Sequence, residues 1–314
     1  NAVDLLSDIV FHSRYPQAEI DKEIEVICDE IESYNDSPAE LIYDLFENII
    51  FAGHPLGHNI LGEASQLRTY TTETALAFTS RYYKPQNAIF FAYGDIDFKR
   101  LVSLLKRTTK GFPASSPVIG DADIVAPLPP YEPQEKIIDK GTHQAHVMIG
   151  NRAYSVHDER RMALYLLNNI LGGPGMNARL NLSLRERHGL VYTVESSMVS
   201  YSDTGVWCVY FGCDPHDVAR CRRLVMKELQ RVTEKPLSTA QLNAAKRQIK
   251  GQLGVASDNR ESFALDFGKS FLHYGWEKDI HNLFKRIDAL TAERIQQVAQ
   301  ETFAPERLTT LIIR

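Results

Sequence analysis

Two stretches of the chain, far apart in the sequence, follow one pattern: a helix entered through Thr-x-Glu, a short turn with a proline, and an apolar run. The first is TTETALAFTSRYYKPQNAIFFAYG at 71–94, and the second is LTAERIQQVAQETFAPERLTTLIIR at 290–314. In each stretch, helical spacing is followed by an apolar run that is typical of a strand. A repeat of this kind predicts two copies of one α+β domain.

The segment between the two copies, residues 110–136, has a different character. Its sequence, KGFPASSPVIGDADIVAPLPPYEPQEK, is rich in proline, serine and glycine and has little periodicity, as expected of an extended linker. The predicted fold class is therefore α+β, with two similar domains, each a mostly antiparallel sheet packed with helices. Residues 1–109 are predicted to be the C-terminal part of the first domain, and residues 137–314 to be the second domain.

The first residues predict a helix that buries one face, because Val3, Leu6, Ile9 and Val10 repeat at helical spacing. An intact domain seldom begins inside such a helix without a cap or a tail. We therefore expect a further segment upstream of Asn1, so that the first domain is truncated at its N-terminus.

Periodicity predicts most of the remaining elements. Apolar residues at helical spacing predict helices at 16–36 and at 176–189. Alternating or β-branched runs predict a strand at 87–97, a second strand at 145–154 and a hairpin at 190–213.

Composition excludes several classes of protein. The formal net charge of the 314-residue chain is −5, so no nucleic-acid partner is expected. No apolar run reaches the 18 residues or so that a membrane helix needs, so no membrane span is expected. The four cysteines are too few and too scattered for a disulfide framework. We expect a soluble protein, cytoplasmic or periplasmic, and the sequence does not indicate which.

Glu23 and Glu30 are the first candidate functional residues. They lie seven residues apart on the predicted helix 16–36, which places both carboxylates on one line, about 10.5 Å apart along the axis. Both border the apolar stripe of that helix, which consists of Ile20, Ile24, Ile27 and Ile31. A carboxylate there can bind zinc or orient a histidine that does. The alternative is that both are solvated acids on the flank of an acidic helix.

The histidines do not complete a zinc site by any familiar motif. None of the ten forms HExxH or HxxEH. The pairs His54/His58 and His143/His146 lie in a Gly/Pro loop and at the start of a strand, where the two members of each pair are not expected to share one face.

Arg185 and Tyr192 are the second candidate pair. Gly189 separates them, and this predicts a helix–glycine–strand corner that points a guanidinium and a phenol in the same direction. Together they would donate hydrogen bonds to a carbonyl and to the oxyanion that it becomes. The alternative is an arginine favoured by the helix dipole and a tyrosine that packs across the strands.

Four segments, in order, resemble the pitrilysin-type zinc peptidases, the family with an HxxEH motif that also includes mitochondrial processing peptidase and insulysin. The segments are EIEVICDEIESYNDSPAELIYDLF, HPLGHNILG, YYKPQNAIFFAYGDID and LGGPGMNARLNLSLRERHGLVYTVES. The resemblance covers almost the whole chain.

The resemblance implies a role for each candidate residue. Glu30 is similar to the distal zinc ligand, and Glu23 to the supporting glutamate seven residues before it. Arg185 and Tyr192 look like the pair that contacts the substrate carbonyl. The family carries HxxEH well before the zinc glutamate, and only 29 residues precede Glu30 here. The two histidine ligands and the general-base glutamate are therefore expected upstream of Asn1.

The function implied is that of a zinc-dependent metalloendopeptidase, a hydrolase that cleaves peptides held in a cleft between two domains. The chain lacks HxxEH and is expected to be inactive alone. The alternative is a non-catalytic, peptidase-like subunit that binds substrate or a catalytic partner. The expected partners are a peptide or small-protein substrate and a second subunit, in a homodimer or as a pair with a related chain.

Overall fold

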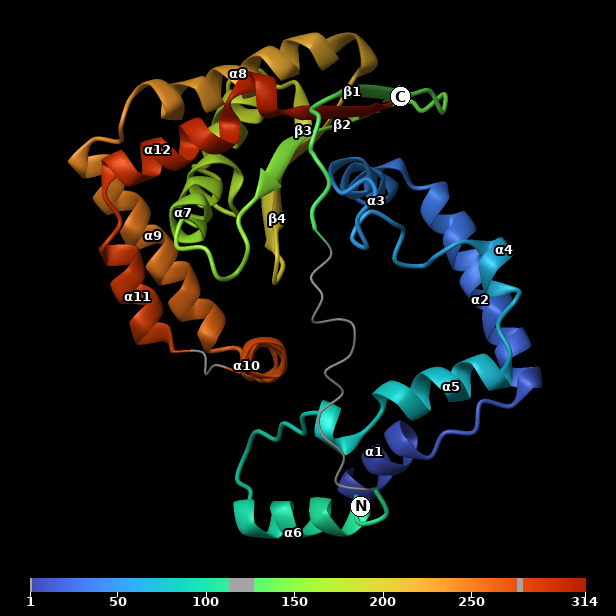
Figure 1. Ribbon diagram of the computed structural model, residues 1–314. Coiled ribbons are helices and arrows are strands. Elements are labelled where there is room, and N and C mark those ends of the chain that lie inside the picture. Colours follow the sequence, from blue (N-terminus) through green and yellow to red (C-terminus); the bar gives the residue numbers. More distant parts are fainter. Residues whose placement is uncertain (1, 113–126, 276–278) are drawn as a thin grey trace. The chain divides into compact units, whose positions relative to one another are not determined.

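The computed structural model describes residues 2–112, 127–275 and 279–314 (Figure 1). The chain forms two compact units, each assembled from three stretches. The first unit comprises Asn1–Glu32, Leu61–Val125 and Gly254–Asp279, and the second comprises Ser33–Ile60, Ala126–Leu253 and Ile280–Arg314. The division into domains 1–109 and 137–314 stays a prediction, and residues 113–126 of the predicted linker lie outside the described residues.

The described part of the first unit is helical. Its elements are α1 (Ala2–Phe11), most of α2 (Gln17–Asn35), α4 (Ala64–Leu67), α5 (Thr72–Tyr82), η1 (Pro85–Asn87), α6 (Phe98–Thr108) and α10 (Arg260–Tyr274). Helices α1 and α6 pack together, and Arg107 of α6 forms an ion pair with Asp4 of α1 at 2.8 Å.

The N-terminal helix is present, but it does not bury the face that its spacing predicted. Val3 is buried, whereas Leu6, Ile9 and Val10 are exposed. The periodicity correctly indicated an amphipathic helix. It could not indicate which neighbouring element covers the apolar side, because that depends on tertiary packing.

The strand predicted at 87–97 is wrong. No residue of this range belongs to a strand in the described structure, and α6 begins directly after it. A strand requires a neighbour with which to share backbone hydrogen bonds, and alternation of side chains does not supply one. Aromatic rings of this segment instead contact α10: Phe91 lies 5.2 Å from Phe267, and Tyr93 lies 5.8 Å from Phe263, between ring centroids.

The second unit contains a five-stranded sheet with the order β1-β5-β2-β4-β3. Its strands are β1 (Glu135–Ile138), β2 (Ala145–Ala153), β3 (Val191–Ser200), β4 (Gly205–Cys213) and β5 (Thr309–Ile313). Only the β1–β5 pair is parallel; the other pairs are antiparallel. The strand predicted at 145–154 and the hairpin predicted at 190–213 are confirmed.

Helices cover both faces of this sheet (Figure 1). On one face lie α7 (Arg161–Gly172), α8 (Val218–Glu234) and α12 (Ala292–Phe303), and on the other lies α3 (Pro38–Ile50). The alternation of side chains along β2 explains the two cores, since Val147 and Ile149 join the first and Met148 joins the second. The second unit also includes most of α9 (Thr239–Ser257) and all of α11 (Ile280–Asp288). The α+β fold class is confirmed, with the sheet in the second unit. The sheet predicted for the first domain is not found in the described residues of the first unit.

The internal repeat is visible in the helix and in the turn. Thr71 and Thr291 both cap their helices, accepting hydrogen bonds from the N–H groups of Thr74 (3.3 Å) and Arg294 (3.2 Å). Fourteen residues after each cap, a proline opens a 3-10 turn, in η1 and in η5 (Pro305–Arg307). A strand follows the turn only in the second copy, where β5 has neighbours on both sides.

No helix among residues 2–112, 127–275 and 279–314 combines the length and the apolar character needed to cross a bilayer.

Candidate functional site

The two glutamates lie on α2 as the sequence predicted. Ile24 and Cys28 are buried on this helix, and both Glu23 and Glu30 are exposed beside them. Neither carboxylate has a hydrogen bond or ion pair with another residue of the described ranges. Other acids of the helix are engaged: Asp21 accepts a hydrogen bond from Gln17 at 2.7 Å.

A catalytic zinc in proteins is held by about three protein ligands. Within the described residues, no group of three histidine, cysteine or acidic side chains includes Glu30. The residues present therefore do not form a zinc site by themselves. Glu30 can supply one carboxylate ligand to a metal, and the described residues around it add no second or third ligand.

Arg185 and Tyr192 are brought together. The guanidinium carbon of Arg185 lies 5.7 Å from the centroid of the Tyr192 ring, within the range of a cation–π contact. The side chain of Arg185 is 44% exposed, and Tyr192 is 83% exposed. A guanidinium and a phenol hydroxyl thus stand together, with donors free to meet a ligand.

The helix before this corner differs from the one predicted at 176–189. It is a π-helix, η3 (Asn181–Glu186), in which the Arg187 N–H donates to the Leu182 carbonyl five residues back at 3.1 Å. Such wide turns are rare and occur frequently at functional sites. Gly189 has φ +61, a left-handed conformation that glycine adopts without strain, and its N–H donates to the Arg185 carbonyl at 2.9 Å.

Tyr192 lies in a β-bulge. Val191 pairs with Cys213 and Val194 pairs with Phe211, so Tyr192 and Thr193 together oppose the single residue Gly212. A bulge of this kind redirects a side chain and interrupts the ladder. Neither the π-helix nor the bulge was predicted; the only sequence signal was Gly212, since glycine inside a strand often marks a bulge.

The contact between the buried His54 and Asp203 was also not predicted. His54 is almost completely buried, its Nδ1 accepts a hydrogen bond from the Leu56 N–H at 3.3 Å, and its Nε2 lies 3.4 Å from Oδ2 of Asp203. This pair ties the loop after α3 to the β3–β4 turn. It is a structural contact within the second unit.

The partial burial of His146 leads us to expect that the stability of the fold depends on pH. Burial lowers the pKa of His146 below 6.5, and its Nδ1 lies 2.9 Å from the Tyr210 hydroxyl. The unfolded chain therefore binds the proton first as the pH falls. We expect the free energy of unfolding to decrease as the pH drops below about 6.5, and to level off below the folded-state pKa.

Urea unfolding between pH 7.5 and 5 measures this effect in the native protein and in His146→Gln. The variant should lose part of the pH slope. Identical slopes in the two proteins would show that His146 does not contribute, and His143→Gln, which changes an exposed histidine three residues away, is the matched control.

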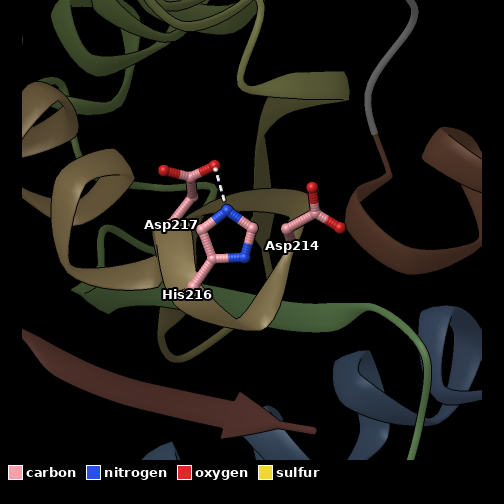
Figure 2. Close-up of side chains that lie close together, drawn as sticks. All are labelled: Asp214, His216 and Asp217. Atoms are coloured by element: carbon pink, nitrogen blue, oxygen red, sulfur yellow. Dashed lines mark ion pairs between the residues drawn. The ribbon is translucent and has the colours of Figure 1, made fainter.

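Figure 2 shows a second cluster, at the end of β4, in which the His216 imidazole lies between the carboxylates of Asp214 and Asp217. The Nε2 atom of His216 is 3.4 Å from Oδ2 of Asp217. The three potential ligand atoms lie within 4.8 Å of one another. His216 and Asp214 are exposed, and exposed groups of this type are common without a metal. The cluster is therefore not assigned as a metal centre.

Comparisons with known sequences support the family resemblance. The family described as "Peptidase M16 inactive domain" matches residues 69–249. An uncharacterized zinc protease of Bacillus subtilis, YmxG, is 29% identical over 311 residues, which cover 99% of this chain and 74% of YmxG. An uncharacterized zinc protease of Mycobacterium bovis is 29% identical over 304 residues, which cover 95% of this chain and 68% of that protein.

Solved structures show the same fold. A protease from Helicobacter pylori matches with a TM-score of 0.85 at 19% identity, covering 100% of this chain and 76% of that one. A chain of Complex III2 from Candida albicans matches with a TM-score of 0.82 at 16% identity, covering 99% and 76% of the two chains. Because the family match spans more than half of the sequence, the chain belongs to the peptidase M16 family, the pitrilysin-type group that its motifs resemble.

Proposed function

We propose that this protein acts in zinc-dependent endoproteolysis, and that its second unit contacts the substrate peptide through Arg185 and Tyr192. The observation that carries the proposal is the exposed Arg185–Tyr192 pair, presented by a π-helix and a bulge in a chain whose relatives are named zinc proteases. A guanidinium and a phenol can donate hydrogen bonds to the carbonyl oxygen and, more strongly, to the negative charge that develops on it.

Glu30 is proposed as one carboxylate ligand of the zinc, and Glu23 as the carboxylate that supports a neighbouring ligand. Their exposure and lack of partners in the described residues support these roles, because both carboxylates are available. When bound, zinc would supply Lewis-acid activation of a water molecule.

The test of this function is peptide hydrolysis by the protein isolated from its natural source. Hydrolysis of an unfolded peptide should stop when a chelator removes zinc and return when zinc is restored. Peptide hydrolysis that is insensitive to chelation would contradict the proposal.

The 314-residue chain alone is expected to bind no stoichiometric zinc tightly and to show no turnover, because one carboxylate does not make a site. Zinc titration against a competing indicator, together with a peptide cleavage assay, measures both. Weak uptake that disappears in His216→Ala would belong to the exposed cluster of Figure 2. Stoichiometric zinc with turnover by this chain would contradict the expectation.

The second candidate function is that of a non-catalytic subunit, which binds a peptide or a catalytic partner. Two observations favour it: the matching family description is that of an inactive domain, and no other described ligand joins Glu30. This candidate predicts that the natural protein binds peptides in an Arg185-dependent way without hydrolysing them. We further propose that the protein pairs with a second subunit, as a homodimer or with a related chain, which light scattering tests.

A further inference from the structure

A pocket of about 710 Å³ lies in the second unit, where η3, the end of α8 and the start of α9 meet. Six titratable side chains line it: Arg179, Arg187, Arg231, Lys235, Glu228 and Glu234. Arg185 and Tyr192 are not among the residues that line it. The pocket is therefore distinct from the proposed substrate contact.

Both acids of the pocket are already engaged by their own helix. Glu228 is only 4% exposed, and its Oε1 accepts a hydrogen bond from the Arg231 guanidinium. Glu234 accepts one from the Gln230 amide. Glu228 bonds to Arg231 and also attracts Arg179 electrostatically, and Glu234 keeps its negative charge because the Gln230 amide is neutral. The four cations that line the pocket still outnumber its two acids.

Arg179 is the central cation of the pocket. It is half-buried, and its side chain makes no hydrogen bond or ion pair with any residue of 2–112, 127–275 or 279–314. Burial lowers the pKa of Arg179, yet a guanidinium stays charged at every physiological pH. Glu228 attracts this guanidinium electrostatically but accepts no hydrogen bond from it, so its five N–H donors have no acceptor among the described residues.

Two further cations of the pocket are exposed to solvent. The side chains of Arg187 and Lys235 also have no hydrogen-bond or ion-pair partner in the described part of the chain. With four cations and two acids around it, the pocket has a net positive charge that favours the entry of an anion.

The N-terminus of α9 adds to the positive potential. Ser238 and Gln241 line the pocket, and they cap this 19-residue helix reciprocally: the Gln241 N–H donates to Ser238 Oγ (3.3 Å), and the Ser238 N–H donates to Gln241 Oε1 (3.0 Å). A helix N-terminus carries about half a positive charge and favours anions.

We infer that this pocket binds a multiply charged oxyanion of the phosphate type, held by Arg179, Arg187 and Lys235. Two guanidinium forks and an ammonium group surround an anion from several sides, which suits a tetrahedral, multiply charged group better than one planar carboxylate. The volume leaves room for a diphosphate or a triphosphate. This inference does not depend on the proposed peptidase function.

The test is calorimetric titration of pyrophosphate into the full chain at constant ionic strength. Saturable binding of one pyrophosphate per chain is expected. Arg179→Ala and Lys235→Ala should each weaken it at least tenfold. Lys227→Ala is the matched control, because Lys227 is an exposed cation on α8 that does not line the pocket, and it should bind as the native protein does.

Equal affinity in the native protein, Arg179→Ala and Lys235→Ala would overturn the site. Lys235 is exposed, so its variant tests the site even if removal of Arg179 disturbs folding. An acidic peptide that displaces pyrophosphate and binds more tightly would overturn the assignment of a phosphate-type ligand. Tripolyphosphate binding as tightly as a nucleoside triphosphate would support recognition of the phosphates alone.

Discussion

Arg185→Ala is expected to lower kcat for peptide hydrolysis by about 100- to 1,000-fold in a zinc-loaded preparation that cleaves peptides. The guanidinium is exposed beside the Tyr192 ring and has no strong partner of its own, since Glu186 lies 3.9 Å away. Its donors are therefore available to the oxyanion, and a donor used mainly in the transition state affects kcat more than KM. A quenched-fluorescence peptide measures both constants.

Two further variants make this result interpretable. Tyr192→Phe keeps the ring against the guanidinium and removes only the hydroxyl, so a fall in kcat would assign that hydroxyl to the transition state. Arg223→Ala removes an exposed arginine of α8 and should leave kcat unchanged. Unchanged kcat in Arg185→Ala as well would rule out a catalytic role for the corner.

Trp207→Ala is expected to lower the free energy of unfolding by about 3–5 kcal/mol, the usual cost of deleting a large buried aromatic. Trp207 is completely buried in β4, and its ring centroid lies 4.3 Å from that of Phe303 on α12. Its Nε1–H donates to Asn168 Oδ1 at 3.0 Å, so the variant also leaves that amide oxygen without its donor. Chemical denaturation followed by circular dichroism measures the change.

Trp207→Phe is a smaller change at the same position. It keeps most of the ring and removes the donor, and a loss of about 1–3 kcal/mol is expected. Met176→Ala changes an exposed side chain of the same unit and should alter stability by less than about 0.5 kcal/mol. A loss below about 1 kcal/mol for Trp207→Ala would show that the surrounding side chains close the cavity.

The fold was predictable where one local signal was sufficient. Alternation located β2 and the β3–β4 hairpin, and Thr-x-Glu located the starts of α5 and α12 to within a residue or two. The strand at 87–97 failed because alternation shows which side chains share a face, and not whether a second strand is present to pair with. The prediction that α1 buries its apolar face failed for a similar reason. The spacing shows that the helix has an apolar face, and tertiary packing decides whether another element covers it.

The proximity of Arg185 and Tyr192 was predictable, and the backbone geometry that presents them was not. Spacing and Gly189 indicated that Arg185 and Tyr192 share a corner. In the structure, the guanidinium carbon of Arg185 lies 5.7 Å from the centroid of the Tyr192 ring. The π-helix and the bulge that present them depend on which backbone groups pair, and this follows from the assembled sheet. The His54–Asp203 contact joins segments about 150 residues apart, which no local pattern indicates. The roles of Glu23 and Glu30 stay predictions.

The position of β5 has a consequence for synthesis on the ribosome. This strand lies between β1 and β2, and Tyr131 hydrogen-bonds to Thr309, a residue 178 positions later. The sheet therefore cannot close until residue 313 has left the exit tunnel, and until then β1 has no neighbour and one edge of β2 is open. Contacts so distant in sequence fold slowly and expose strand edges to other chains. During translation, the edges of β1 and β2 thus stay unpaired longer than those of the local β3–β4 hairpin.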